Sequence, residues 1–309
     1  MEYFLQQLVN GITLGSIYGL IAIGYTMVYG IIGMINFAHG DVFMVGGFVS
    51  LIAIVMLGLT GGSGLFPIIL ALIVVVFIAM FIAAAYNWTI ERVAYRPLRG
   101  SFRLAPLISA IGMSLVLQEF VRISQGARER WTPPVFNQPI ALAQADEFIV
   151  TVTPMQIVVA ILGLAAACGV LLLLGRTRFG RAWRAFADDP GTAALFGIDG
   201  GRLLATTFLL AGLLAGLAGW IVAAYYGNIS FSMGAMLGLK ALVAAVVGGI
   251  GSVPGAFLGG VCVALIEGMW SAYFEITARD IVVFSLLIVV FVWRPGGLLG
   301  FAGPKPRDV

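Results

Sequence analysis

The sequence predicts an all-α polytopic membrane protein, a bundle of about nine transmembrane helices. Of its 309 residues, 61% are hydrophobic and 10% are charged, and the mean hydropathy is +1.06. Soluble domains are about half apolar and about a quarter charged, so the 17 basic and 14 acidic residues are too few to cover a water-facing surface. The apolar runs are continuous and do not alternate, which favours helices over the strands of an outer-membrane barrel.

Nine apolar segments approach the length of about 20 residues that a membrane-spanning helix needs. Since such limits are read from a single sequence, the expected number of spans is about eight to ten. The predicted spans are residues 9–33, 41–60, 66–87, 105–125, 155–175, 203–226, 234–250, 255–273 and 280–293.

Basic residues are divided unevenly between the two sets of loops that these spans define. Basic residues in short loops mark the cytoplasmic side of a membrane. We therefore expect the N-terminus outside, the C-terminus in the cytoplasm and an odd number of spans. One set holds Arg92, Arg96, Arg99, Arg103, Arg176, Arg178, Arg181, Arg184, Arg202, Arg294, Lys305 and Arg307, whereas the other holds Arg122, Arg128, Arg130 and Arg279.

The whole chain, residues 1–309, reads as a single transmembrane domain with two long loops. Residues 126–153 form a polar, proline-bearing loop on the expected external side. This loop is too weakly apolar to form a core of its own, so we expect an external cap or lid. Residues 176–202 form an arginine-rich loop on the cytoplasmic side.

Glycines give two further signals. Glycines four residues apart let helix backbones touch in lipid, and we favour packing within the subunit over a seam between two subunits. Glycine and proline also interrupt an apolar segment in each half of the chain, at residues 30–40 and 248–254. Such broken segments in both halves point to a translocation path. The glycines at four-residue spacing are Gly11, Gly15 and Gly19, then Gly212 and Gly216, then Gly255 and Gly259.

Asn36, His39 and Asp41 lie between two apolar runs, where polar side chains are costly without partners. They are candidates for a gate or for the cytoplasmic mouth of a path. We favour a structural interpretation, in which Asp41 caps the second helix and the other two bind carbonyls of the turn. The single histidine has no neighbouring residues that would complete a metal site.

Lys240 and Glu267 are the other candidates for the path or its gate. Lys240 lies near the start of its span, so it either extends toward water or faces a cavity. Glu267 lies deeper, and a pair with Lys240 would satisfy both charges. With Asp41 and Glu119 they make up the ionisable groups at membrane depth, which an ion-coupled secondary transporter would use as a proton relay.

The cytoplasmic loop contains an amphipathic segment followed by a short predicted helix. Asp189 is placed to cap this helix, Pro190 to begin it and Gly197 to end it. Its apolar residues indicate a docking surface for a partner, unless the helix folds back on the bundle. The predicted docking residues are Asp188, Asp189, Pro190, Ala193, Ala194, Leu195, Phe196 and Gly197.

Several function classes find no support in the sequence. It has no GxxxxGK[ST] phosphate loop, no HExxH pattern and no nucleophile elbow. Cys168 and Cys262 both lie in apolar runs, as is typical of inert packing. The net charge of +3 is too small to suggest nucleic acid. We therefore expect no enzyme activity, cofactor or metal, and any ATP used must be hydrolysed by another chain.

Five stretches, in order along nearly the whole chain, resemble the inner-membrane permeases of branched-chain amino-acid ABC importers. Of the two types of permease subunit in these importers, the chain resembles the H-like type. The stretches include "NFAHGD", "ERVAYRPLRG" and "WRPGGLLG". The resemblance implies a permease in the inner membrane that moves branched-chain or related amino acids. The five stretches are residues 15–48, 91–100, 180–198, 239–260 and 293–300.

The resemblance also implies the partners. These are two cytoplasmic ABC ATPase subunits that bind the ATP, a second permease subunit of a different, M-like type, and an external solute-binding protein. Residues 188–199 would then be the coupling segment, which enters a groove of the ATPase. Relatives carry urea or short amides on the same scaffold, and an ion-coupled secondary transporter is the alternative from another class.

Overall fold

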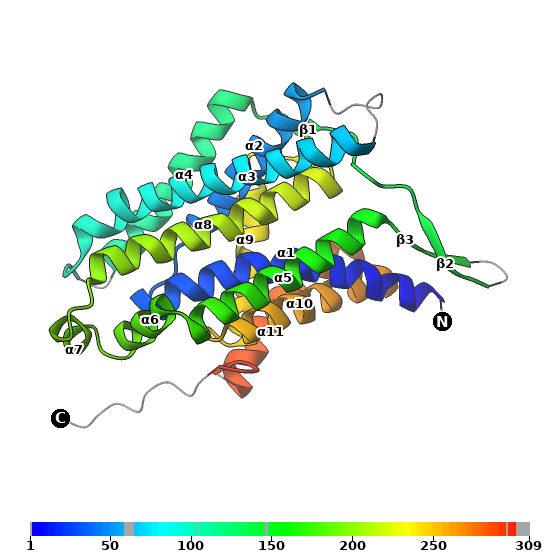
Figure 1. Ribbon diagram of the computed structural model, residues 1–309. Helices are drawn as coiled ribbons and strands as arrows, with labels where there is room; N and C mark the ends of the chain where they lie inside the picture. Colours follow the sequence, from blue (N-terminus) through cyan, green and yellow to red (C-terminus); the bar gives the residue numbers. More distant parts are fainter. Residues whose placement is uncertain (1, 59–64, 103, 146–147, 295, 301–309) are drawn as a thin grey trace.

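The computed structural model of the chain is a mostly helical bundle, and it describes residues 2–58, 65–102, 104–145, 148–294 and 296–300 (Figure 1). Within these ranges, eight helical segments are long and apolar enough to span a membrane. The helices are α1 (Glu2–Ile32), α2 (His39–Met56), α3 (Leu65–Ile90), α4 (Ala105–Gln125), α5 (Pro154–Arg176), α6 (Arg178–Asp188), α7 (Pro190–Leu195), α8 (Gly200–Tyr225), α9 (Met233–Gly248), α10 (Val253–Tyr273) and α11 (Arg279–Trp293).

The nine predicted spans coincide with α1 to α5 and α8 to α11. Eight of these helices belong to the segments that are long enough to cross a membrane, whereas α9, with 16 residues, is apolar but shorter. Both predicted breaks are present, because Gly33 follows α1 with φ +72° and Gly249 follows α9 with φ +107°. Residues 59 and 60 of the second predicted span lie outside the described residues, as do Arg103, Lys305 and Arg307.

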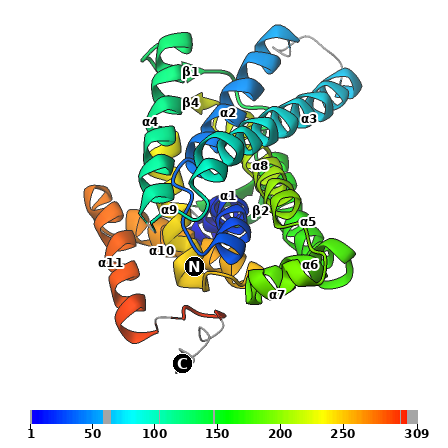
Figure 2. The ribbon, with the colours of Figure 1, turned by 90° about the vertical axis from the view of Figure 1, so that its left-hand side faces the viewer.

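α1 lies in the middle of the bundle, with α2, α5, α8, α9 and α10 around it (Figure 2). Gly11, Gly15 and Gly19 face α10, and a Cβ at Gly15 would come within 2.6 Å of the Val261 Cα. The row of glycines therefore brings two helix backbones into direct contact inside the chain. Packing within the subunit is confirmed for this row.

The other spaced glycines also pack inside the chain. On α8, a Cβ at Gly212 would come within 2.6 Å of the Ala84 Cα of α3, and one at Gly216 would come equally close to the Ala79 carbonyl oxygen. On α10, Gly259 faces the backbone of α9. These contacts fix α3, α8, α9 and α10 at short interaxial distances, as small residues do in membrane bundles.

Two small sheets depart from the all-helical prediction. β2 (Ile140–Ala145) and β3 (Phe148–Val152) form an antiparallel hairpin within the predicted external loop. β1 (Arg130–Trp131) pairs with β4 (Asn228–Ile229), which connects α8 to α9. The predicted external loop is therefore hydrogen-bonded, through β1, to the segment that follows α8. Prolines and polar residues indicated a loop, but the pairing depends on a segment about a hundred residues away, which no local pattern reveals.

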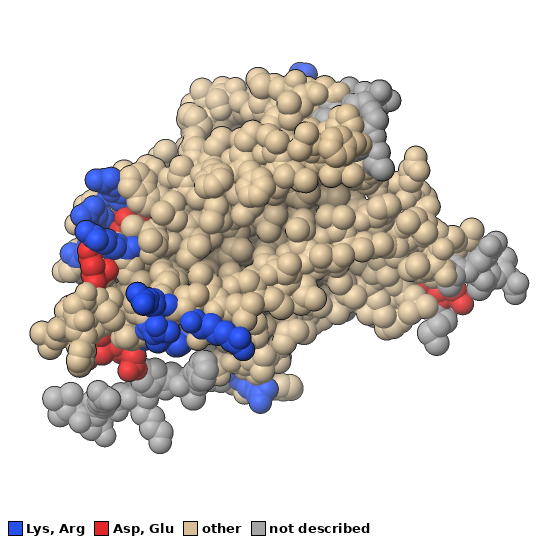
Figure 3. Space-filling model, viewed as in Figure 1, with Lys and Arg blue, Asp and Glu red and all other residues tan. Residues whose placement is uncertain are grey.

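Charged side chains gather at one end of the bundle. On the face shown in Figure 3, the basic residues concentrate where α6 and α7 lie. Figure 2 looks onto this arginine-rich end, with α4 and α11 at the periphery. The β2–β3 hairpin and the start of α1 lie at the opposite end (Figure 1). The uneven charge that the sequence indicated therefore corresponds to the two ends of one bundle.

Candidate functional site

The predicted docking segment is a capped short helix at the arginine-rich end. The Asp189 carboxylate accepts hydrogen bonds from the backbone N–H groups of Gly191 (2.9 Å) and Thr192 (3.1 Å), so it caps α7 as predicted. Pro190 is the first helical residue, and Gly197, with φ +81°, follows the end of the helix. α7 ends at Leu195, one residue before Phe196, which was its expected last residue with Gly197 placed after the end of the helix.

α6 connects this segment to the bundle. It is amphipathic, because Trp183 is buried and Phe179 and Phe186 pack on the core, whereas Arg181 and Arg184 are exposed. The Arg184 guanidinium donates to the Leu174 carbonyl near the end of α5. α6 therefore lies along the bundle end and carries α7 beyond it, as Figure 1 shows.

α7 presents an apolar surface to its surroundings. Leu195 is 88% exposed and Phe196 81% exposed, whereas Ala193 is buried. Asp188, Pro190, Ala194 and Gly197 are exposed as well. The alternative in which the short helix folds back on the bundle is therefore wrong for these two large side chains. Exposed apolar side chains at a polar end of a protein are typical of an interaction site.

A groove of about 1,080 Å³ lies beside this segment at the arginine-rich end. Its walls come from α6, the end of α1, the end of α9 and the turn that follows it, the end of α11, and residues 294, 296–298 and 300. Asp188 and Trp183 line it from α6, Tyr29 lines it from α1, and Val246 lines it from α9. The groove extends from the docking segment to α1 and α9. These two helices also line the cavity described next.

A second cavity, of about 530 Å³, lies at the opposite end of the bundle. We refer to it as the outer cavity. It is lined by α1, α8, α9, α10 and the start of α11. Lys240 and Glu267 both line it, with their Nζ and Oε1 atoms 2.6 Å apart and each residue only 4% exposed. The predicted pair is confirmed, and Lys240 does not extend toward water.

The two cavities share the walls that α1 and α9 provide. Between them lies a gap lined by Tyr25, Thr26 and Tyr29 of α1 and by Leu242 and Ala245 of α9, and no volume in it is open to a water molecule. The crevice between α1 and α9 therefore has a cavity at each end and no open volume in its middle.

Asn36, His39 and Asp41 line neither of these cavities. They are at most 1% exposed, and the His39 ring packs edge-on against Tyr25, with centroids 4.8 Å apart. Gly24 provides the space, because any Cβ there would collide with the His39 imidazole. His39 and Asp41 thus lie where α1, α2 and α9 meet, whereas Asn36 lies against α3. The predicted gate role of these three residues stays a prediction.

The capping interpretation of this stretch is wrong. α2 begins at His39, with Ala38 at the cap position, so Asp41 falls inside the first turn. The two carboxylate oxygens of Asp41 and the two ring nitrogens of His39 have no hydrogen-bond partner among the described residues. Asn36 donates to the Asn87 side chain and not to a turn carbonyl. Residues 33–38 reverse the chain with glycine geometry, which needs no side-chain acceptor.

Glu119 lies apart from the other ionisable groups. It pairs with Arg122, three residues along α4, with 2.5 Å between Oε2 and Nη2, and both side chains are about half exposed. Within the described part of the chain, Asp41 forms no ion pair, and Lys240 is already paired with Glu267. These four groups therefore do not form the continuous chain that a proton relay needs.

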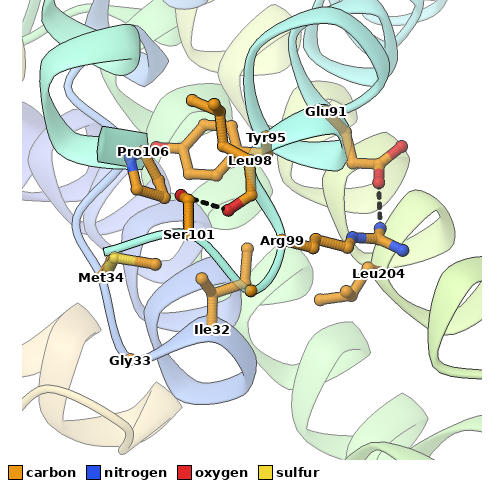
Figure 4. A pocket seen from close by; sticks show the side chains of 11 residues that line it. Ile32, Gly33, Met34, Glu91, Tyr95, Leu98, Arg99, Ser101, Pro106 and Leu204 are labelled. Atoms are coloured by element: carbon orange, nitrogen blue, oxygen red, sulfur yellow. Dashed lines mark hydrogen bonds and ion pairs between the residues drawn. The ribbon is translucent and has the colours of Figure 1, made fainter. Parts of the chain in front are cut away.

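A third cavity, of about 280 Å³, lies near the arginine-rich end, between the turn after α1 and the segment after α3 (Figure 4). That segment contains a π-helix, η1 (Glu91–Tyr95), and a 3₁₀-helix, η2 (Arg96–Leu98). The Arg99 guanidinium points at Glu91, which is 2% exposed, and forms an ion pair with it. In the sequence, Arg99 served only as a marker of topology. Its pair with Glu91 was not predicted, because only the helical break after α3 brings the two residues together.

Comparison with known proteins decides the family. Residues 7–292 match the family described as the branched-chain amino acid transport system, permease component. The chain belongs to this family of permeases. The permease is 46% identical over 302 residues to the high-affinity branched-chain amino acid transport system permease protein LivH of Escherichia coli K12, with 96% of each chain covered.

Further relatives extend the comparison. BraD of Pseudomonas aeruginosa, described with the same transport system, is 44% identical to this permease over 96% of each chain. The fructose import permease protein FrcC of Rhizobium meliloti is 33% identical over 40% of this chain. No solved structure matches the chain. The permease is therefore a multi-pass membrane protein of a transport family.

Proposed function

We propose that this chain is the inner-membrane permease subunit of an ABC importer for branched-chain amino acids. The relatives that cover almost its full length at 44–46% identity are all described as permeases of high-affinity branched-chain amino acid transport systems. FrcC, which is described for fructose, matches only 40% of the chain. The full-length relatives therefore support a branched-chain amino acid as the substrate more strongly than any other solute.

The same proposal includes nine spans within a single transmembrane domain, with the N-terminus outside and the C-terminus in the cytoplasm. Support comes from the gathering of arginines at the end that carries α6 and α7, because basic loops mark the cytoplasmic side. α9 would be a short ninth span, set between the glycine-rich connections at its two ends. Residues 126–153 would then cap the external end of the bundle.

One observation carries the proposed mechanism: Leu195 and Phe196 stand exposed on a capped helix at the arginine-rich end. We propose that residues 188–199 insert into a groove of a cytoplasmic ATPase subunit, which binds and hydrolyses the ATP. Closure of two such subunits would move α6, and with it the ends of α5 and α1 that α6 contacts. The crevice between α1 and α9 would open and close in response.

The remaining partners follow from this scheme. A binding protein outside the cell would deliver the solute to the end of the bundle that the β2–β3 hairpin covers. A second, M-like permease subunit would complete the path, since α4 and α11 have their surfaces largely uncovered at the periphery. The chain itself would carry no cofactor and perform no catalysis.

The test replaces both Leu195 and Phe196 with Asp in the complete transporter. We expect the ATPase subunits to be lost during purification in detergent and leucine uptake to disappear, because two charges replace the apolar contact. Leu142→Asp is the matched control for copurification and should retain the ATPase subunits, because Leu142 is 63% exposed on the β2–β3 hairpin at the opposite end. Unchanged copurification and uptake in the double variant would refute the coupling proposal.

The energy source and the substrate are tested together in vesicles that contain the complete transporter. We expect ATP to drive the uptake of labelled leucine and valine, and an uncoupler to leave it unchanged. Collapse of uptake with the uncoupler while ATP remains would favour an ion-coupled transporter. Uptake of urea but not of leucine would assign the chain a different solute.

A further inference from the structure

Four ionisable side chains from three helices meet beside the outer cavity, and three of them, Lys240, Glu267 and Arg279, line it. The Lys240 ammonium on α9 lies 2.6 Å from Glu267 Oε1 on α10 and 2.7 Å from Asp280 Oδ1 on α11. The Arg279 Nε atom lies 3.4 Å from the same Asp280 oxygen and 3.8 Å from Glu267. We refer to Lys240, Glu267, Arg279 and Asp280 as the charge cluster.

The charge cluster is electrically balanced, because its two cations match its two carboxylates. Lys240 and Glu267 are almost fully buried, whereas Arg279 and Asp280 are partly exposed at the rim. A solute with a net charge would add an uncompensated charge to this low-dielectric wall, which is costly. A solute that carries one positive and one negative group can exchange partners with the cluster and leave the total charge at zero.

The cluster retains the hydrogen-bonding capacity for such an exchange. An ammonium group has three N–H donors and a guanidinium group has five, so Lys240 and Arg279 have more donors than the contacts described above use. Glu267 Oε2 accepts from the Tyr18 hydroxyl at 2.8 Å, which fixes the carboxylate in place. A carboxylate of a solute would bind the two cations, and an ammonium group would bind the two carboxylates.

The outer cavity also has apolar lining residues, which we refer to as the apolar wall. They are Leu14 and Ile17 from α1, Val222 from α8, and Met233 and Leu237 from α9, and the polar Tyr226, Asn228 and Ser230 line the cavity as well. The volume, about 530 Å³, lies within the range of small-molecule sites, about 300–1,000 Å³. One cavity therefore combines a charge-balanced polar side with a surface for an aliphatic chain.

We propose that the outer cavity is a binding site for the transported amino acid as a zwitterion. The charge cluster receives the ammonium and carboxylate groups, and the apolar wall receives the side chain. This inference rests on the proposed function. It predicts that the permease itself favours solutes with zero net charge and paired ionic groups, in addition to any choice made by the binding protein.

A purely structural ion pair makes the opposite prediction for one variant. Replacing a buried ion pair with apolar residues of similar size is often neutral or stabilising. A pair that only holds α9 and α10 together would therefore be replaceable by K240M/E267M with uptake retained. A binding site for a zwitterion cannot be replaced in this way, because the methionines offer no ionic partner.

The experiment compares the wild type and K240M/E267M as complete transporters in vesicles, with leucine-loaded binding protein. Leucine imported per ATP hydrolysed should fall by about tenfold or more in the variant, the effect of losing a charge-assisted contact. Import per ATP near the wild-type value would overturn the proposal. If the wild type itself imports no leucine, both the proposed function and the zwitterion site are refuted. If the wild type imports leucine and the variant imports it equally well, only the zwitterion site is refuted.

Leu237→Trp provides a second measurement that leaves the charge cluster in place. Leu237 lines the apolar wall and is only partly buried, so a larger side chain can extend into the cavity. We expect leucine import per ATP to fall while alanine, a shorter zwitterion presented at equal binding-protein occupancy, is less affected. If Leu237→Trp imports both leucine and alanine at the wild-type rate, the proposal is overturned, even where K240M/E267M fails to assemble.

Discussion

Gly15 of α1 lies directly against Val261 of α10, close enough that a Cβ on Gly15 would come within 2.6 Å of the Val261 Cα. This contact joins the central helix of the bundle to a helix that borders the outer cavity. Because the nearest atom belongs to the backbone, the neighbour cannot move aside by changing a rotamer. The position of α1 relative to α10 therefore depends on the absence of a side chain at residue 15.

Gly15→Ala is expected to destabilise the permease by about 1–3 kcal/mol, the usual cost of overpacking a core. The measurement is the midpoint of thermal unfolding in detergent. Gly268→Ala is the matched control on α10, because no atom lies within 4 Å of a Cβ at Gly268. This control should be neutral or slightly stabilising, since alanine favours helix more than glycine does. Equal midpoints for both variants would contradict the close contact.

The Asp189 cap gives a second prediction. The carboxylate satisfies two backbone N–H groups at the start of α7, and loss of such a cap costs about 1 kcal/mol. Asp189→Ala should let α7 fray and lower ATP-driven leucine uptake several-fold, with the overall thermal midpoint little changed. Asp189→Ser retains a capping oxygen and should restore most of the uptake. Full uptake in the alanine variant would show that α7 need not be ordered.

Local signals in the sequence predicted much of this fold. Capping, proline and glycine positions located α7 to within one residue, because each of these preferences acts between neighbours in the chain. Continuous apolar length located the spans, since a membrane sets that length directly. The pair of Lys240 and Glu267 was also predictable, because two unlike charges at membrane depth have few other ways to be stabilised.

Contacts between distant segments could not be predicted in this way. Tyr18, Arg279 and Asp280 join the Lys240–Glu267 pair only because α1, α9, α10 and α11 meet around the outer cavity. The error at Asp41 has the same origin. Its position suggested a cap, but α2 begins earlier, where Gly40 packs against the backbone of α9 at Gly234 and Gly238. A single sequence does not show which glycine surfaces meet.

Asp41 provides a third prediction. Neither oxygen of its buried carboxylate has a hydrogen-bond partner among the described residues, and Ser114 and Gln118 of α4 face it. A buried group without a partner costs stability. Asp41→Asn removes a potential charge at nearly constant shape, so we expect a thermal midpoint equal to or above that of the wild type. Asp41→Leu removes both polar atoms as a comparison. A clear drop in the midpoint for Asp41→Asn would show that the carboxylate is held by a partner.

The orientation of the bundle in the membrane provides the last prediction. It is tested with single cysteines placed at the two ends of the bundle. Leu142 on the β2–β3 hairpin and Leu195 after α7 are 63% and 88% exposed. With Cys168 and Cys262 replaced and the ATPase subunits omitted, a membrane-impermeant maleimide should label Leu142→Cys in intact cells. Leu195→Cys should react only after the membrane is broken, because basic loops mark the cytoplasmic side. The reverse pattern would put α7 outside, where no ATPase could reach it, and would remove the basis for coupling.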